Sequence, residues 1–134
     1  MKMGKLEFCT KAGYPYLRNN VWSWDATSKD GSVLMLVWQD DSERVDRGVE
    51  RVWVWGNSPS DMQRGGVERK RHLDLISSGV SGVVAFCTSN DGSHSSIDDI
   101  NPVLFRVVAI EPPDATGKVH VIAHHPNLRA SLTA

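Results

Sequence analysis

Residues 65–79 read GGVERKRHLDLISSG, and they decide the fold because they carry the clearest helical pattern in the chain. At about 100° per residue, Leu73, Leu75 and Ile76 fall on one arc of a helical wheel over residues 67–78. Gly79 follows as a C-terminal cap. Segments with strand character lie on both sides of this stretch. The sequence therefore predicts one main helix among strands.

Two of the predicted strands lie before this helix. Residues 33–38, VLMLVW, form an apolar run too short for a typical helix, which indicates a central strand covered on both faces. Residues 49–55, VERVWVW, alternate, so that Val52 and Val54 face one way and the intervening side chains face the other. We predict that these two strands pair as an antiparallel hairpin around a solvated loop at 39–48.

The other predicted elements complete the fold class. A short strand is expected at 19–24, a strand at 81–87, one helical turn at 96–102, and a hairpin of 103–111 with 117–124. The order predicts an α+β fold, with a strongly bent, mostly antiparallel sheet or a partly closed β-barrel of about six strands. One main α-helix, about 67–78, packs on it.

Length and composition indicate a single globular domain over residues 1–134, with a loose tail from about 126. Hydrophobic residues at 40% and charged residues at 23% argue against disorder and against a membrane protein. The start of the chain lacks the apolar centre of a secretory signal peptide. Cys9 and Cys87 form no CxxC pair, so we expect a reducing, cytoplasmic setting.

The overall charge excludes a broad nucleic-acid surface. The formal net charge is −1 and the pI is near 6.5, so the chain lacks the basic footprint that supplies sequence-independent affinity. Any contact with nucleic acid would have to be local.

Three polar residues of the predicted helix, Glu68, Arg69 and His72, lie on its packed side or at the edges of that side. An unpaired buried ion there costs on the order of several kcal/mol. In the structural explanation, Glu68 sits at the positive helix end and pairs with His72, while Arg69 reaches a sheet carboxylate. In the functional explanation, the three line a pocket where Arg69 holds an anion or a planar acceptor edge.

The two glycines before this helix also have two explanations. Gly65 and Gly66 could let backbone amides approach a phosphate at the positive helix end. Since neither GxGxxG nor GxxxxGK[ST] is present, the phosphate signal is weak, and we favour a break in the chain after Arg64.

Aromatic content departs most from an ordinary domain, with five tryptophans beside two tyrosines and three phenylalanines. Trp53 and Trp55 share one face of their strand, and Trp22 and Trp24 share a face of theirs, so the rings could form a platform for a flat base. Arg51 points to the same face as Trp53 and Trp55 and could stack on them. Alternatively, the indoles fill the core of a small curved sheet.

No metal site and no cofactor is predicted. His120 and His124 belong to an HxxxHH pattern, but on a strand they lie roughly 13 Å apart, too far for one zinc. A bend at the following His-Pro would be needed to bring them together.

Catalytic groups other than those of the helix carry weak signals. Cys87, with His94 or His72 as base, could be a nucleophile, but it ends an apolar strand and is expected to be buried. The acidic pairs Asp40–Asp41 and Asp98–Asp99 are expected to be solvated turns rather than acid/base or magnesium sites.

We therefore favour a small binding module that holds a planar or anionic ligand, such as a nucleotide or base. Its site would be a tryptophan-lined face next to helix 67–78, formed by Trp22, Trp24, Arg51, Trp53, Trp55, Arg69 and His72. One alternative is a small enzyme that uses Glu68 and His72 as an acid/base pair, although a non-enzymatic role is favoured. Another is a homodimer with tryptophans at its interface.

A helix over a bent sheet, the segment G-x-x-E-R at residues 65–69 and several tryptophans together resemble small PUA-like barrels that read nucleic-acid bases. The resemblance concerns the fold alone, because no continuous motif aligns. It implies a local contact with a nucleic-acid base, and no family site residue is carried onto this chain.

Overall fold

A computed structural model describes residues 4–19, 22–90, 92, 94 and 97–127. Within these residues there are two α-helices, α1 (Lys5–Lys11) and α2 (Arg64–Ser77), and two short 3₁₀ helices, η1 (Gln39–Asp41) and η2 (Pro59–Met62). The strands are β1 (Asp25–Thr27), β2 (Val33–Trp38), β3 (Ser42–Asp46), β4 (Val49–Trp55), β5 (Gly82–Thr88), β6 (Asp99–Ile100), β7 (Phe105–Ile110) and β8 (Val119–His124). No helix among the described residues is long and apolar enough to cross a membrane.

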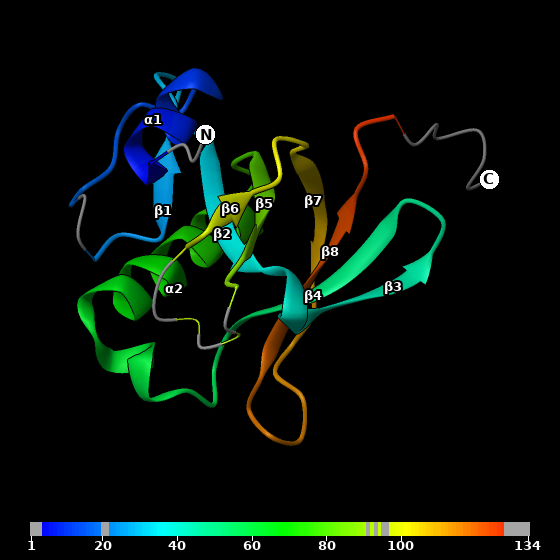
Figure 1. Cartoon of the computed structure of the whole chain (residues 1–134). Coiled ribbons are helices and arrows are strands. Elements are labelled where there is room, and N and C mark those ends of the chain that lie inside the picture. Colours follow the sequence, from blue (N-terminus) through cyan, green and yellow to red (C-terminus); the bar gives the residue numbers. More distant parts are fainter. Residues whose placement is uncertain (1–3, 20–21, 91, 93, 95–96, 128–134) are drawn as a thin grey trace.

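The strands form one eight-stranded mixed sheet in the order β1-β2-β5-β7-β8-β4-β3, with β6 paired to β5. Strands β2 and β5 are parallel, and the other pairs are antiparallel. Both helices lie toward the β1 and β2 end of this sheet, and the β3–β4 hairpin projects on the opposite side (Figure 1). The α+β prediction is confirmed, and the sheet is not closed into a barrel.

The predicted hairpin between residues 33–38 and 49–55 is wrong. Strand β4 instead pairs with β3, which occupies half of the loop expected at 39–48, and with β8 on its other side. A short turn joins β3 to β4 at Gly48, whose φ of 72° suits glycine. Closing this short local hairpin costs less chain entropy than closing the longer loop that we predicted.

Other sequence predictions have mixed outcomes. The strand at 81–87 and the hairpin of 103–111 with 117–124 are confirmed as β5, β7 and β8. The helical turn at 96–102 is wrong, because the two residues of β6 pair with β5 there. No strand covers the described residues of 19–24, and residues 20–21 and 128–134 lie outside the described part of the chain.

The core confirms that residues 33–38 are a central strand with both faces covered. Val33, Met35 and Val37 pack in one cluster with Leu73 of α2. The alternate residues of β2 pack in a second cluster, which includes Phe8 of α1. Helix α1 was not predicted from the sequence, because its seven residues carry too short a pattern to detect.

Candidate functional site

The candidate site lies where β2 and β4 approach without hydrogen-bonding to each other. The guanidinium of Arg69, from α2, lies between them: Nη2 donates to the carbonyl of Leu36 in β2 at 2.8 Å, and Nη1 donates to the carbonyl of Val54 in β4 at 3.0 Å. Arg69 thereby connects two strands that do not pair. This bridging accounts for the nearness of the two segments that the sequence predicted to be partners.

Arg69 also reaches a sheet carboxylate, as the structural explanation proposed. Its Nε and Nη2 each lie 2.8 Å from Oδ1 of Asp25, the first residue of β1, whose side chain is almost fully buried. His72 contacts the other oxygen, with Nδ1 2.8 Å from Oδ2. An ionised carboxylate only accepts hydrogen bonds, so Nδ1 of His72 carries the proton that it donates.

The two carboxyl groups of this cluster have opposite pKa shifts. Burial would raise the pKa of Asp25, but the charge of Arg69 and hydrogen bonds from His72 and Arg69 outweigh it and hold that pKa below its ordinary value. Burial and the nearby charge of Asp25 raise the pKa of Glu68. One oxygen of Glu68, Oε1, has no hydrogen-bond partner among the described residues.

Asp25, Glu68 and His72 bring three potential ligand atoms within 4.8 Å of one another, which is a spacing that a metal could use. However, the guanidinium of Arg69 already lies against Asp25. A divalent cation would have to share that carboxylate with a fixed positive charge. We therefore interpret the grouping as a structural ion-pair cluster and carry no metal chemistry through it.

The two glycines at the start of α2 permit close packing. A Cβ on Gly65 would lie 2.8 Å from the carbonyl oxygen of Trp22, and one on Gly66 would lie 2.1 Å from that of Ser60. The carbonyl of Gly66 accepts a hydrogen bond from Nε1 of Trp55 at 2.9 Å. This packing explains both glycines without a bound phosphate.

A cavity of about 630 Å³ opens beside Arg69, and all five tryptophans line it. They come from three places: Trp22 and Trp24 precede β1, Trp38 ends β2, and Trp53 and Trp55 lie in β4. Each indole is half-buried. The volume falls in the range of ordinary small-molecule sites, about 300–1,000 Å³.

Hydrogen bonds hold several of these indoles in place. Nε1 of Trp53 donates to the carbonyls of Trp55 at 3.0 Å and Gly56 at 2.9 Å. On the far side, Lys5 of α1 donates to the carbonyl of Ser23, between the first two tryptophans. Helix α1 therefore helps to position the Trp22–Trp24 segment.

Two rings show how a flat group fits in the cavity. The imidazole of His94 stacks on Trp38, with centroids 4.3 Å apart and planes within 3° of parallel. Nε2 of His94 lies 3.1 Å from Oδ2 of Asp40, which orients the ring. The ring of Trp24 packs against the indole of Trp38, with the two planes tilted by 60°.

Some of the predicted site residues lie elsewhere. Arg69 lines the cavity together with the predicted tryptophans, whereas Arg51, Glu68 and His72 are not among the described residues that line it. Arg51 is engaged by Glu111 at 2.7 Å, Glu43 at 3.2 Å and His120 at 3.2 Å. The acid/base hypothesis for Glu68 and His72 stays a prediction.

The weaker candidates have clear positions. His120 and His124 lie on one strand, β8, as expected. Cys87 is buried, and burial raises the pKa of its thiol to about 12, which leaves it protonated at neutral pH. Its environment does not activate it as a nucleophile.

Sequence reasoning did not assign Trp38, Asp41 or His94 to the site, yet all three line the cavity. Trp38 ends β2, and Asp41 lies three residues later in the following connection, where binding residues are often found. That position was the available signal. The place of His94 depends on how a distant loop folds back.

Comparison of the chain with protein-family models, with curated proteins and with solved structures finds no match in any of the three. The sheet is not closed into a barrel, so the resemblance to PUA-like barrels is not confirmed at the level of the fold. The contact with a nucleic-acid base that it implied and the homodimer hypothesis for the tryptophans stay predictions.

Proposed function

We propose that the protein is a binding module that holds a small planar ligand, such as a base or nucleotide, among the tryptophans of the cavity beside α2. The observation that carries the proposal is the convergence of all five indoles on one cavity from three parts of the chain. Trp24, Trp38 and Trp55 also pack against the core clusters, but none of the five indoles is fully buried, and each leaves part of its surface at the cavity.

The stacked pair supports a planar ligand in particular. His94 and Trp38 lie parallel at 4.3 Å, so the lining itself stacks an aromatic ring on an indole. The imidazole covers that face of Trp38, and a ligand would extend the stack or use another indole. Base–aromatic stacking contributes about 1–3 kcal/mol per base. Two or more such contacts would give measurable affinity for a free nucleoside.

A hydrogen-bond donor of the described cavity lining that has no partner indicates a polar feature of the ligand. Nε1 of Trp22, a residue of the cavity lining, is buried and has no hydrogen-bond partner among the described residues. A buried N–H without a partner costs about 1–3 kcal/mol, and an acceptor atom on the ligand would recover part of that once the ring of Trp22 turns to expose Nε1 to the cavity. The ligand should therefore carry a hydrogen-bond acceptor as well as a flat ring.

The anionic part of the ligand, if present, would meet Arg64 rather than Arg69. The nitrogen atoms of Arg69 already bond to Asp25, Leu36 and Val54. Arg64 lines the cavity and is exposed. A phosphate outside the cavity mouth could pair with it, so nucleotides would bind somewhat more tightly than nucleosides.

Calorimetric titration with adenosine, guanosine, cytidine, uridine and their monophosphates tests the proposal. At least one should bind with a stoichiometry of one, and Trp38→Ala should weaken it by about 10-fold or more. Tyr16→Ala is the matched control, because Tyr16 is 58% exposed and outside the cavity lining. The proposal fails if none of these compounds binds, or if Trp38→Ala binds as tightly as the wild type.

A further inference from the structure

The cavity contains one acidic side chain that the fold does not use, Asp41 at the end of η1. Its neighbour in the lining, Asp61, is different. Both oxygens of Asp61 accept backbone N–H groups, from Gly56 and Ser58, each at 3.1 Å. Asp61 therefore fixes the chain at η2, whereas Asp41 has no hydrogen bond to any described residue.

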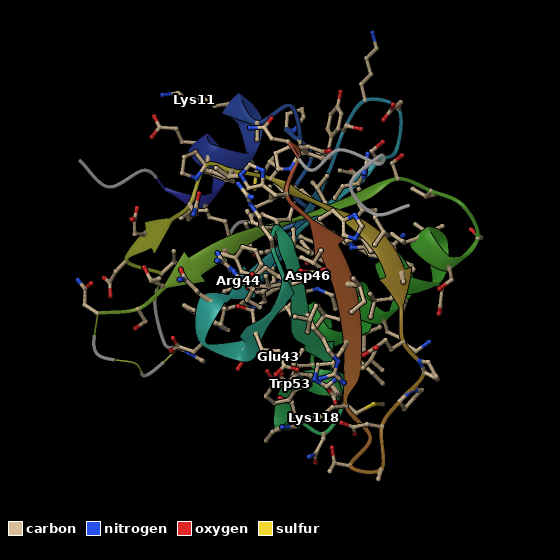
Figure 2. All side chains as sticks on the ribbon, turned by 90° about the vertical axis from the view of Figure 1, so that its right-hand side faces the viewer. Lys11, Glu43, Arg44, Asp46, Trp53 and Lys118 are labelled. Carbon is tan, nitrogen blue, oxygen red and sulfur yellow. The ribbon has the colours of Figure 1, made fainter. Side chains whose placement is uncertain are left out.

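Asp41 lies within electrostatic reach of both walls of the cavity. The charges that act on its carboxyl are those of His94, Asp40 and Lys118. His94 stacks on Trp38, and Lys118 lies over Trp53 with Nζ 4.3 Å from the ring centroid. Figure 2 shows Lys118 beside Trp53 at one end of the sheet. Asp41 lines the same cavity as Trp38 and Trp53, so a flat ring that stacks in this cavity lies near its side chain.

The carboxylate of Asp41 is partly removed from water without gaining a hydrogen bond from the described fold. Asp41 is half-buried, and burial is the main reason that the pKa of its carboxyl is raised above its ordinary value. Nothing in the described fold compensates this loss of hydration by a hydrogen bond. Such uncompensated groups are concentrated at binding sites.

The indoles themselves argue against a cationic ligand. Ammonium groups already lie near three of them: Lys118 over Trp53 at 4.3 Å, Lys5 over Trp24 at 5.7 Å and Lys70 over Trp55 at 5.9 Å. None of the three lysines is among the described residues that line the cavity. A second cation on the cavity side would share the same ring electrons and would be repelled by these charges.

The charged side chains of the described lining that the fold leaves unpaired are one positive and one negative group. Arg69 is paired with Asp25, and Asp61 is held by backbone amides, so Arg64 and Asp41 are the remaining charged side chains of the described lining. One positive and one negative group suit a ligand whose ring is neutral and which has both donor and acceptor atoms.

We propose that Asp41 is the specificity-determining residue of this cavity and accepts the N–H edge of a neutral planar heterocycle that stacks among the tryptophans. The inference rests on the proposed function. It adds that the ring must carry an N–H donor, as unmodified nucleobases do, and that rings methylated on that edge or quaternary ammonium groups are poor ligands.

The test pairs each ring with a version whose N–H edge is blocked: guanosine with 1-methylguanosine, uridine with 3-methyluridine, and adenosine with N6,N6-dimethyladenosine. Tetramethylammonium is the cationic probe. Each is titrated into the wild type, Asp41→Asn, and the control Asp46→Asn, which alters an exposed carboxylate in β3. Isosteric Asn tests the charge of Asp41 with little change of shape.

We expect the wild type and Asp46→Asn to bind at least one unmodified nucleoside about 10-fold or more tightly than its methylated version. Asp41→Asn should reduce that preference by weakening the unmodified nucleoside and leaving the methylated one unchanged, because a neutral amide oxygen accepts an N–H more weakly than a carboxylate does. Equal binding of both members of every pair, preference for a methylated ring, or binding of tetramethylammonium alone would overturn the role of Asp41 while leaving a binding cavity. If no probe binds at all, the proposed function fails as well.

Discussion

Two groups of costly side chains lie at the gap between β2 and β4, and they differ in whether the fold satisfies them. In the Arg69 cluster, the buried side chains of Arg69, Asp25 and His72 contact one another and two strand carbonyls at 2.8 to 3.1 Å. Only Oε1 of the neighbouring Glu68 lacks a partner among the described residues of this cluster. In the tryptophan cavity, Nε1 of Trp22 and the carboxylate of Asp41 have no hydrogen bond to the described residues, although the charges of His94 and Lys118 act on Asp41.

This difference indicates that the Arg69 cluster stabilises the fold, whereas the cavity groups are available for binding. The Arg69 cluster joins α2 to β1, β2 and β4, so its polar groups replace hydrogen bonds that the open sheet cannot make. The cavity groups contribute no such connection. Changes in the first group should therefore alter the free energy of unfolding, and changes in the second should alter binding.

The largest expected effect is that of Arg69→Ala. It leaves Asp25 buried without its countercharge and frees two strand carbonyls, so the free energy of unfolding should fall by about 3–5 kcal/mol, or the chain should fail to fold. Lys70→Ala, one residue along the same helix, should change it by no more than about 0.5 kcal/mol, because the Lys70–Asp74 pair is exposed. Urea denaturation measures both, and equal stability of the two variants would contradict the structural role of Arg69.

Gly66→Ala should have the next largest effect. The new Cβ would lie 2.1 Å from the carbonyl oxygen of Ser60 and 2.6 Å from that of Asp61, both of which are backbone atoms. We expect a loss of about 1–3 kcal/mol, together with weaker ligand binding because η2 must move away from the cavity. Gly4→Ala has open space around it and serves as the control. Wild-type stability of Gly66→Ala in thermal unfolding would show that the packing of η2 on α2 is looser than described.

Glu68→Gln should change how stability depends on pH. Because the folded-state pKa of Glu68 is raised, its contribution is fully present below the ordinary value of 4.5 and is lost as pH rises through the raised pKa. The variant should therefore be more stable than the wild type at neutral pH and should lack this decline. Urea midpoints between about pH 3 and pH 8 provide the measurement.

The same titration contains an internal reference. The pKa of Asp25 is lowered, so its contribution is present above its ordinary value of 3.8 and is lost as pH falls through the lower folded value. Glu68→Gln should keep that acid loss. If the difference between wild type and variant instead grows toward acid, Glu68 is stabilised as a carboxylate and its described environment is wrong.

The smallest effect on stability is expected for Asp41→Asn. Burial raises the pKa of this carboxyl, so the fold does not stabilise its ionised form, and the neutral variant should be as stable as the wild type or slightly more so. A melting temperature measured without ligand tests this. A clear loss of stability would mean that Asp41 has a structural partner and, like Arg69, stabilises the fold.

The local pattern was enough to find the buried polar residues of α2. Positions 68, 69 and 72 fall within an arc of about 100° on the wheel, and the structure buries all three. Their partner could not be found in this way, because Asp25 is 44 residues from Arg69 along the chain. Alternation likewise predicted that Val52 and Val54 lie on the buried face of β4. It could not predict which strands pair with β4.

The cavity was harder to predict because it depends on long-range arrangement. Alternation placed Trp53 and Trp55 together, yet Trp38 was interpreted as part of a covered strand, although its position at the strand end leaves it half-buried. His94 reaches Trp38 from 56 positions away. Neither hydrophobic period nor spacing contains that information.

The most direct test of the central claim follows the indole N–H signals of the five tryptophans by ¹H–¹⁵N NMR while the tightest-binding nucleoside is added. Because all five rings line one cavity, we predict that the signals of Trp22, Trp24 and Trp38 shift together and give one common Kd. The signal of Trp22 should move furthest, since its Nε1 gains an acceptor. Signals that stay unchanged at saturation, or that move with unrelated affinities, would contradict a single tryptophan-lined binding site.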